Sequence, residues 1–138
     1  DFSGNTITLV GGDGGRTDHL LGILETFSSE EKADFWLCCK QIICFIKDGT
    51  KTEISGLTQN DCISVYKMNE KQNASFITKG LEWNSEVFRK TKMPSLSNKI
   101  SSEWLSRKLP VEIIPENTDC LIFIPYTAVV TKSLQQEN

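Results

Sequence analysis

Residues 7–19 have the sequence ITLVGGDGGRTDH, and this stretch decides the first part of the fold. Its first four residues predict a short strand. From Leu20 onward, apolar residues recur at helical spacing and predict a helix over residues 19–28. Four glycines in the five positions 11–15 predict a tight loop between strand and helix. At such a junction, free backbone N–H groups and the helix dipole favour an anion.

Two charged side chains follow the glycines and make this loop a candidate ligand site. Arg16 supplies a forked cation suited to phosphate, and Asp18 supplies a carboxylate. A P-loop is excluded, because Gly15 is followed by Arg-Thr and not by Lys-Ser or Lys-Thr. A G-x-G-x-x-G fingerprint beginning at Gly12 would need glycine in place of Thr17. The alternative is a tight turn in which Thr17 or Asp18 caps the next helix.

A second apolar run, Phe35 to Cys39, has the length of a strand and predicts one that is buried on both faces. Strand, helix and strand within about 40 residues predict the end of a parallel α/β sheet. Two strands and one helix do not complete such a domain. We therefore expect residues 1–41 to be the C-terminal part of an α/β domain whose remainder lies outside this chain.

The pattern changes after residue 41, where short strand-like runs alternate with turns and no helical periodicity is evident. The predicted strands cover residues 42–47, 51–55, 62–68, 74–79, 109–114 and 120–126. Asp48-Gly49 predicts a hairpin between the first two. Short strands at this spacing indicate an antiparallel, jelly-roll-like β-sandwich over residues 42–126, followed by a polar tail over residues 127–138. The overall fold class is α+β.

Composition limits the classes of protein to which the chain can belong. Its 138 residues suit one domain or two small lobes, and a net charge of −3 gives no argument for nucleic acid or an anionic membrane as a partner. Five cysteines without C-x-x-C spacing and one histidine predict buried reduced thiols and no metal site. The polar start and the lack of a long apolar segment predict a soluble, cytoplasmic protein.

Three segments together resemble the thiamin pyrophosphokinase family, in the order and approximate spacing of that family. Residues 11–19, with the pattern G-x-x-G-G-R-x-D-H, are similar to its glycine-rich signature. Residues 78–83, TKGLEW, are similar to its T-x-G-L-K-W/Y segment, and residues 95–98, SLSN, to its S-x-S-N segment. The resemblance covers nearly the whole chain, up to the predicted tail.

This resemblance implies a fold and an activity. The family has an N-terminal α/β catalytic domain and a C-terminal β-sandwich that binds thiamine and dimerises. It transfers pyrophosphate from ATP to the hydroxyl of thiamine, giving thiamine diphosphate and AMP. We therefore expect a homodimer with thiamine and ATP as ligands and Mg²⁺ as the metal. The family's acidic magnesium-binding motifs lie upstream of the glycine-rich loop and nothing here matches them, so we expect the isolated chain to be inactive.

The resemblance also implies roles for individual residues. The substrate-binding residues that it implies are Gly14, Gly15, Arg16, Asp18, Ser97 and Asn98. Arg16 would bind phosphate and Asp18 the aminopyrimidine of thiamine, and these two are the candidate catalytic residues. Ser97 and Asn98 would reach the thiamine site from the partner subunit.

Simpler interpretations stay open for several of these positions. Ser97-Asn98 could be a turn whose side chains bond their own backbone, and Trp83 is expected to be a packing residue. The family often has an aromatic residue that stacks on thiamine just after the Ser-Asn pair, where this chain has Ile100, and Trp104 comes later. The alternative function is a non-catalytic β-sandwich module that binds a small ligand or dimerises.

Overall fold

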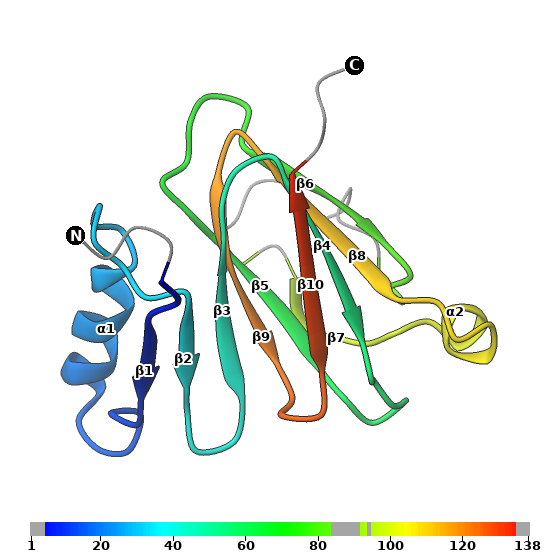
Figure 1. Cartoon of the computed structure of the whole chain (residues 1–138), viewed down its shortest axis with the longest axis horizontal. Helices are drawn as coiled ribbons and strands as arrows, with labels where there is room; N and C mark the ends of the chain where they lie inside the picture. Colours follow the sequence, from blue (N-terminus) through cyan, green and yellow to red (C-terminus); the bar gives the residue numbers. More distant parts are fainter. Residues whose placement is uncertain (1–4, 84–91, 94, 135–138) are drawn as a thin grey trace.

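The computed structural model describes residues 5–83, 92–93 and 95–134, which form two β-sheets with one short helix at each end of the molecule (Figure 1). The strands are β1 (Thr8–Val10), β2 (Phe35–Leu37), β3 (Ile42–Ile46), β4 (Thr50–Ser55), β5 (Ile63–Met68), β6 (Ser75–Lys79), β7 (Ser95–Asn98), β8 (Val111–Glu116), β9 (Asp119–Ile124) and β10 (Val129–Leu134). The helices are α1 (Thr17–Thr26) and α2 (Ser102–Ser106).

The larger sheet has six strands in the order β1-β2-β3-β9-β5-β7, and the smaller has four in the order β10-β4-β8-β6. β1 and β2 are parallel and α1 connects them, whereas the other neighbouring strands are antiparallel. These two antiparallel-rich sheets confirm the predicted sandwich. The α/β domain expected for residues 1–41 stays a prediction, as does a boundary after residue 41, across which β2 pairs with β3.

The central strands β3 and β9 of the six-stranded sheet are largely buried on both faces, which explains their continuous apolar runs. Along β3, Cys44 and Ile46 belong to the core between the two sheets, whereas Ile43 and Phe45 belong to a second core beneath α1. Trp36 of β2 lies in this second core and is fully buried. Successive side chains of a strand point to opposite faces, so a sheet covered on both sides needs apolar residues at consecutive positions.

Most of the predicted elements are confirmed. Each of the six strands predicted between residues 42 and 126 is present, and its ends lie within two residues of the predicted ends. The predicted helix is α1, which begins and ends two residues earlier than expected. The predicted first strand is β1, and the run from Phe35 to Cys39 contains β2.

The hairpin predicted at Asp48-Gly49 is wrong, because β3 and β4 belong to different sheets. The turn is fastened to other strands instead. The amide of Asp48 donates to Oδ1 of Asp119 at 2.9 Å, and the amide of Gly49 donates to the carbonyl of Pro115 at 3.0 Å. These bonds hold the chain where it crosses from one sheet to the other.

The tail predicted for residues 127–138 is wrong over residues 129–134, which form β10 and pair with β4 along their whole length. Most side chains of β10 are exposed, so this edge strand has no buried apolar face that a sequence pattern could reveal. Residues 135–138 lie outside the described residues. α2 was also not predicted, because a single turn capped by the Ser101 hydroxyl, which accepts from the Trp104 amide at 3.3 Å, is too short to have a periodicity.

Candidate functional site

The glycine-rich loop connects the end of β1 to the start of α1, as predicted. Its backbone is fixed to β2: the amide of Gly11 donates to the carbonyl of Leu37 at 2.9 Å, and the indole of Trp36 donates to the carbonyl of Gly11 at 2.6 Å. Gly12 has a φ of +84°, and a Cβ there would lie 2.8 Å from Cδ1 of Ile23. Glycine at this position therefore lets the loop pack closely against α1.

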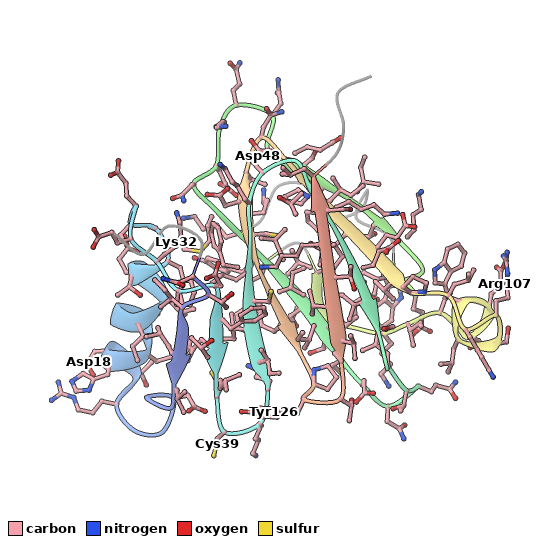
Figure 2. All side chains as sticks on the ribbon, viewed as in Figure 1. Asp18, Lys32, Cys39, Asp48, Arg107 and Tyr126 are labelled. Carbon is pink, nitrogen blue, oxygen red and sulfur yellow. The ribbon has the colours of Figure 1, made fainter. Side chains whose placement is uncertain are left out.

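A second turn, from Cys38 to Gln41, lies beside this loop. Because β1 and β2 are parallel, their carboxyl ends meet at one edge of the sheet. The amide of Cys38 closes the turn by donating to the carbonyl of Gln41 at 3.0 Å. Asp13 of the glycine-rich loop fastens it, because its Oδ2 accepts from the amide of Cys39 at 2.6 Å. The hydroxyl of Tyr126 donates to the carbonyl of Cys38, and Cys39 and Tyr126 lie together at this end of the molecule (Figure 2).

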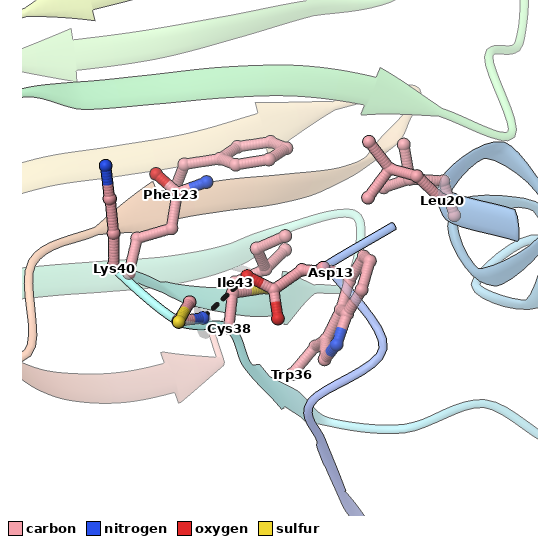
Figure 3. A pocket seen from close by; sticks show the side chains of 11 residues that line it. Asp13, Leu20, Trp36, Cys38, Lys40, Ile43 and Phe123 are labelled. Carbon is pink, nitrogen blue, oxygen red and sulfur yellow. Dashed lines mark hydrogen bonds between the residues drawn. The ribbon is translucent and has the colours of Figure 1, made fainter. Parts of the chain in front are cut away.

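A pocket of about 480 Å³ lies between the two loops, α1 and one face of the six-stranded sheet (Figure 3). Its apolar lining includes Leu20, Leu24, Trp36, Ile43 and Phe123. Its charged lining residues are Asp13 and Lys40. Burial raises the pKa of the Cys38 thiol, which also lines the pocket, to about 11, with a smaller contribution from the Asp13 charge. At neutral pH this thiol is therefore uncharged, and the pocket has the size and character of a small-molecule site.

Arg16 and Asp18 lie in sequence between the pocket-lining residues Gly14 and Leu20, but they do not line the pocket themselves. They pair with each other instead: Nη2 of Arg16 lies 2.5 Å from Oδ2 of Asp18, and its Nε lies 3.0 Å from Oδ1. Their side chains are 75% and 59% exposed. The hydrogen bonds from Arg16 hold the pKa of Asp18 below its usual value. A phosphate that binds Arg16 must therefore compete with this carboxylate.

Ser97 and Asn98 lie on β7, and their environments differ. Ser97 is exposed, has a φ of +51°, and donates its amide to the hydroxyl of Ser64 at 2.9 Å. Asn98 is 1% exposed, and its side chain bonds the backbone of Trp83 and Lys99 and the hydroxyl of Ser95. Within one chain, Asn98 therefore ties the segment at residue 83 to β7.

The TKGLEW segment needs glycine at position 80 because it contacts α2 closely there. Gly80 has a φ of +85°, and a Cβ there would lie 2.2 Å from Cδ1 of Trp104. The indole of Trp104 in turn donates to the carbonyl of Pro110 at 2.8 Å. Trp83 is 51% exposed and does not pack in the core, contrary to the expectation from sequence. Trp104 takes the packing role instead.

The single chain brings together only part of the predicted site. Gly14 lines the pocket, Gly15 and Arg16 follow it in the same loop, and Asp18 lies in the first turn of α1. β7, which carries Ser97 and Asn98, is at the opposite edge of the six-stranded sheet from β1. No motif marks the Cys38–Gln41 turn, although a turn that follows the second of two parallel strands lies at the same end of the strands as the loop that follows the first.

Two further findings concern metals and membranes. Within the described ranges, His, Cys, Asp and Glu side chains nowhere gather in a group of three that could hold a metal ion. These residues therefore do not fit the Mg²⁺ that the family resemblance implies. Neither helix of the described ranges has the length and apolar character needed to cross a bilayer.

Comparison with known proteins gives a likeness in fold. No protein-family model matches the chain, and no curated protein matches it in sequence. The structure resembles the thiamin pyrophosphokinase from Candida albicans with a TM-score of 0.62 and 16% identity, over 88% of this chain and 44% of that one. A crystal structure of a protein from Lactobacillus plantarum gives a TM-score of 0.62 and 12% identity, over 87% of this chain and 55% of that one. The chain thus spans about half the length of these structures, and at such identities the likeness establishes the fold alone.

Proposed function

We propose that this chain is part of a thiamine diphosphokinase, which transfers pyrophosphate from ATP to the hydroxyl of thiamine and releases AMP. The observation that carries the proposal is the fold likeness to a thiamin pyrophosphokinase over 88% of the chain. The placement of the glycine-rich loop supports it, because the loop lies at a strand-to-helix junction beside a pocket of small-molecule size.

In this proposal the glycine-rich loop receives the phosphates. The amides of Gly14 and Gly15 donate no hydrogen bond within the described chain, so they are available to an anion. Arg16 would bind phosphate through its forked guanidinium, and Asp18 would accept from the aminopyrimidine of thiamine. Both must leave their present pairing to do so. Positioning and fixed charges of this kind supply much of the rate in phosphoryl transfer.

The proposed enzyme is a homodimer with a shared site. Ser97 and Asn98 would face thiamine in the site that the partner subunit's loop forms. Within one chain, β7 and β1 are at opposite edges of the six-stranded sheet, so Ser97 and the Arg16-Asp18 pair do not meet without a second copy. A two-fold axis would then generate two such sites, each with contributions from both chains.

Magnesium would neutralise the charge of the transferring group in such an enzyme. The described residues provide no group of His, Cys, Asp or Glu side chains that could hold it. We propose that the ligands belong to a portion of the protein outside this chain, which spans 44% of the Candida albicans enzyme. The cytoplasm, where ATP is abundant, is the proposed location.

A second candidate is a non-catalytic module that binds a small ligand. One observation favours it: the pocket is preformed, whereas Arg16 and Asp18 neutralise each other outside it. Such a module would use the pocket without transferring a group.

Two measurements test the proposal and separate these candidates. Calorimetric titration with thiamine should detect binding to this chain, and incubation with thiamine, ATP and Mg²⁺ should give no thiamine diphosphate. The protein from the full reading frame should give product, and Asp18→Asn in it should weaken thiamine binding more than ATP binding. A full-length protein that binds thiamine and never turns it over would favour the module, and turnover by this chain alone would contradict the proposed position of the metal site.

A further inference from the structure

The turn from Cys38 to Gln41 is built to hold one conformation. One hydrogen bond closes it, from the amide of Cys38 to the carbonyl of Gln41 at 3.0 Å. Two more fasten it from outside: the Asp13 carboxylate accepts from the amide of Cys39 at 2.6 Å, and the Tyr126 hydroxyl donates to the carbonyl of Cys38. A turn fixed from both sides presents its side chains to a ligand with little loss of conformational entropy on binding.

Lys40 extends from this turn and lines the pocket (Figure 3). It is exposed, and it has no ion pair or hydrogen bond within the described chain. Arg16, the cation of the glycine-rich loop, is compensated by Asp18 at 2.5 Å. Asp13, the carboxylate of the lining, already accepts a hydrogen bond from the turn. Among the described residues, Lys40 is therefore the cation of the pocket lining that forms no ion pair.

The remaining lining determines what kind of ligand fits. Trp36, Ile43 and Phe123 give the pocket apolar walls that suit a flat ring, and the free amide of Gly14 adds a hydrogen-bond donor. An ammonium group and free amides near an apolar cavity favour a molecule with a ring at one end and an anion at the other.

We infer that Lys40 binds the phosphate end of a ligand whose ring lies in the pocket. The inference rests on the proposed function in one respect, because that function makes the ligand thiamine diphosphate, the product. It extends that function by assigning a second cation to the diphosphate, on the turn after β2, where no motif marks it.

The test compares two lysines that flank the same strand. Lys40 precedes β3 and Lys47 follows it, and both are exposed and without an ion pair in the described chain. Lys40→Ala and Lys47→Ala therefore change the net charge equally, at opposite ends of the strand. Each variant and the wild-type chain are titrated calorimetrically with inorganic pyrophosphate, thiamine diphosphate and thiamine. Lys40→Arg serves as the conservative variant.

Lys40→Ala should weaken pyrophosphate and thiamine diphosphate about tenfold or more, because a charge-assisted hydrogen bond is lost. The affinity of Lys40→Ala for thiamine, whose side chain ends in an uncharged hydroxyl, should change less than about twofold. Lys47→Ala should change all three affinities less than about twofold, because the charge of Lys47 is screened from the pocket. Lys40→Arg should retain most of the wild-type affinity. Alkylation of Cys39, an exposed thiol of the same pocket, gives a second readout: pyrophosphate should slow it in the wild-type chain and not in Lys40→Ala.

Three results would overturn the inference: no pyrophosphate binding by the wild-type chain, equal binding by Lys40→Ala, or equal weakening by Lys47→Ala. The same titrations distinguish failure of this inference from failure of the proposed function. If pyrophosphate binding depends on Lys40 but thiamine does not bind, the anion site stands and the proposed substrate is wrong.

Discussion

Replacing Asn98 with alanine should destabilise the protein by about 3 kcal/mol, although family resemblance makes this residue a ligand of thiamine. Its Nδ2 donates to the carbonyl of Trp83 at 2.6 Å and to the hydroxyl of Ser95 at 3.0 Å. Its Oδ1 accepts from the amides of Trp83 at 3.2 Å and of Lys99 at 2.9 Å. The side chain is 1% exposed, so alanine leaves these partners facing a cavity.

The magnitude follows from these four bonds. A net contribution of about 1 kcal/mol for each would total about 4 kcal/mol, and access of water to some of the abandoned backbone groups reduces the loss to about 3 kcal/mol. For a domain of this size, such a loss corresponds to a fall in Tm on the order of 10 °C.

Urea denaturation followed by tryptophan fluorescence measures the loss, with Asn60→Ala as the matched control. Asn60 is exposed, its side chain makes no hydrogen bond in the described chain, and its replacement should change the free energy of unfolding by less than about 0.5 kcal/mol. If Asn98→Ala were as stable as Asn60→Ala but had lost affinity for thiamine, the bonds to Trp83 would contribute nothing and Asn98 would be a ligand residue.

Three further predictions concern the loops and thiols. Gly80→Ala should destabilise the protein by more than about 2 kcal/mol, because the new Cβ would lie 2.2 Å from the Trp104 ring and the φ of this residue is +85°. Urea denaturation measures this loss, and an unchanged midpoint would contradict the contact. Ellman's reagent should modify the two exposed thiols of the native protein at neutral pH, while the three buried thiols, whose pKa values burial raises, should react only after unfolding. In an NMR titration the pKa of Asp18 should lie below 3.8 and rise in Arg16→Ala. Because the folded pKa is the lower one, the pair stabilises the fold above the unfolded pKa and loses this effect as the pH falls through the folded pKa.

Much of the fold could be predicted because burial leaves a pattern in the sequence. β3 is apolar at consecutive positions, since Ile43 and Cys44 face different cores, and this run predicts the strand. The strands that pair with β3 could not be predicted, because Asp48-Gly49 specifies only a reversal of the chain. Pairing is decided by distant groups such as Asp119, which binds the turn. β10 was missed because its mostly exposed side chains carry no apolar alternation.

The candidate site divides in the same way. The glycine-rich loop could be predicted because its glycines, its charges and the start of α1 are adjacent in sequence. The pocket could not be predicted, because Phe123 of β9 reaches it from more than eighty residues beyond Cys39. Lys40 carries no signal of its own. Only the parallel pairing of β1 and β2 identifies its turn as part of the site.

The Arg16-Asp18 pair leads to a final expectation about how the binding of one ligand changes the affinity for the other. A phosphate that reaches Arg16 must displace a carboxylate 2.5 Å from the guanidinium, so one charged contact replaces another and little affinity is gained. Lys40 has no such partner to lose. In the proposed enzyme, Arg16→Ala should therefore weaken pyrophosphate binding less than Lys40→Ala does.

This difference between the two variants should shrink when thiamine is present, because an amino group that engages Asp18 releases Arg16 for the phosphate. Thiamine and pyrophosphate should then strengthen each other's binding, and this coupling should vanish in Asp18→Asn. Titration of each ligand in the presence of the other measures the coupling, and independent binding would show that Arg16 and Asp18 form only a surface ion pair.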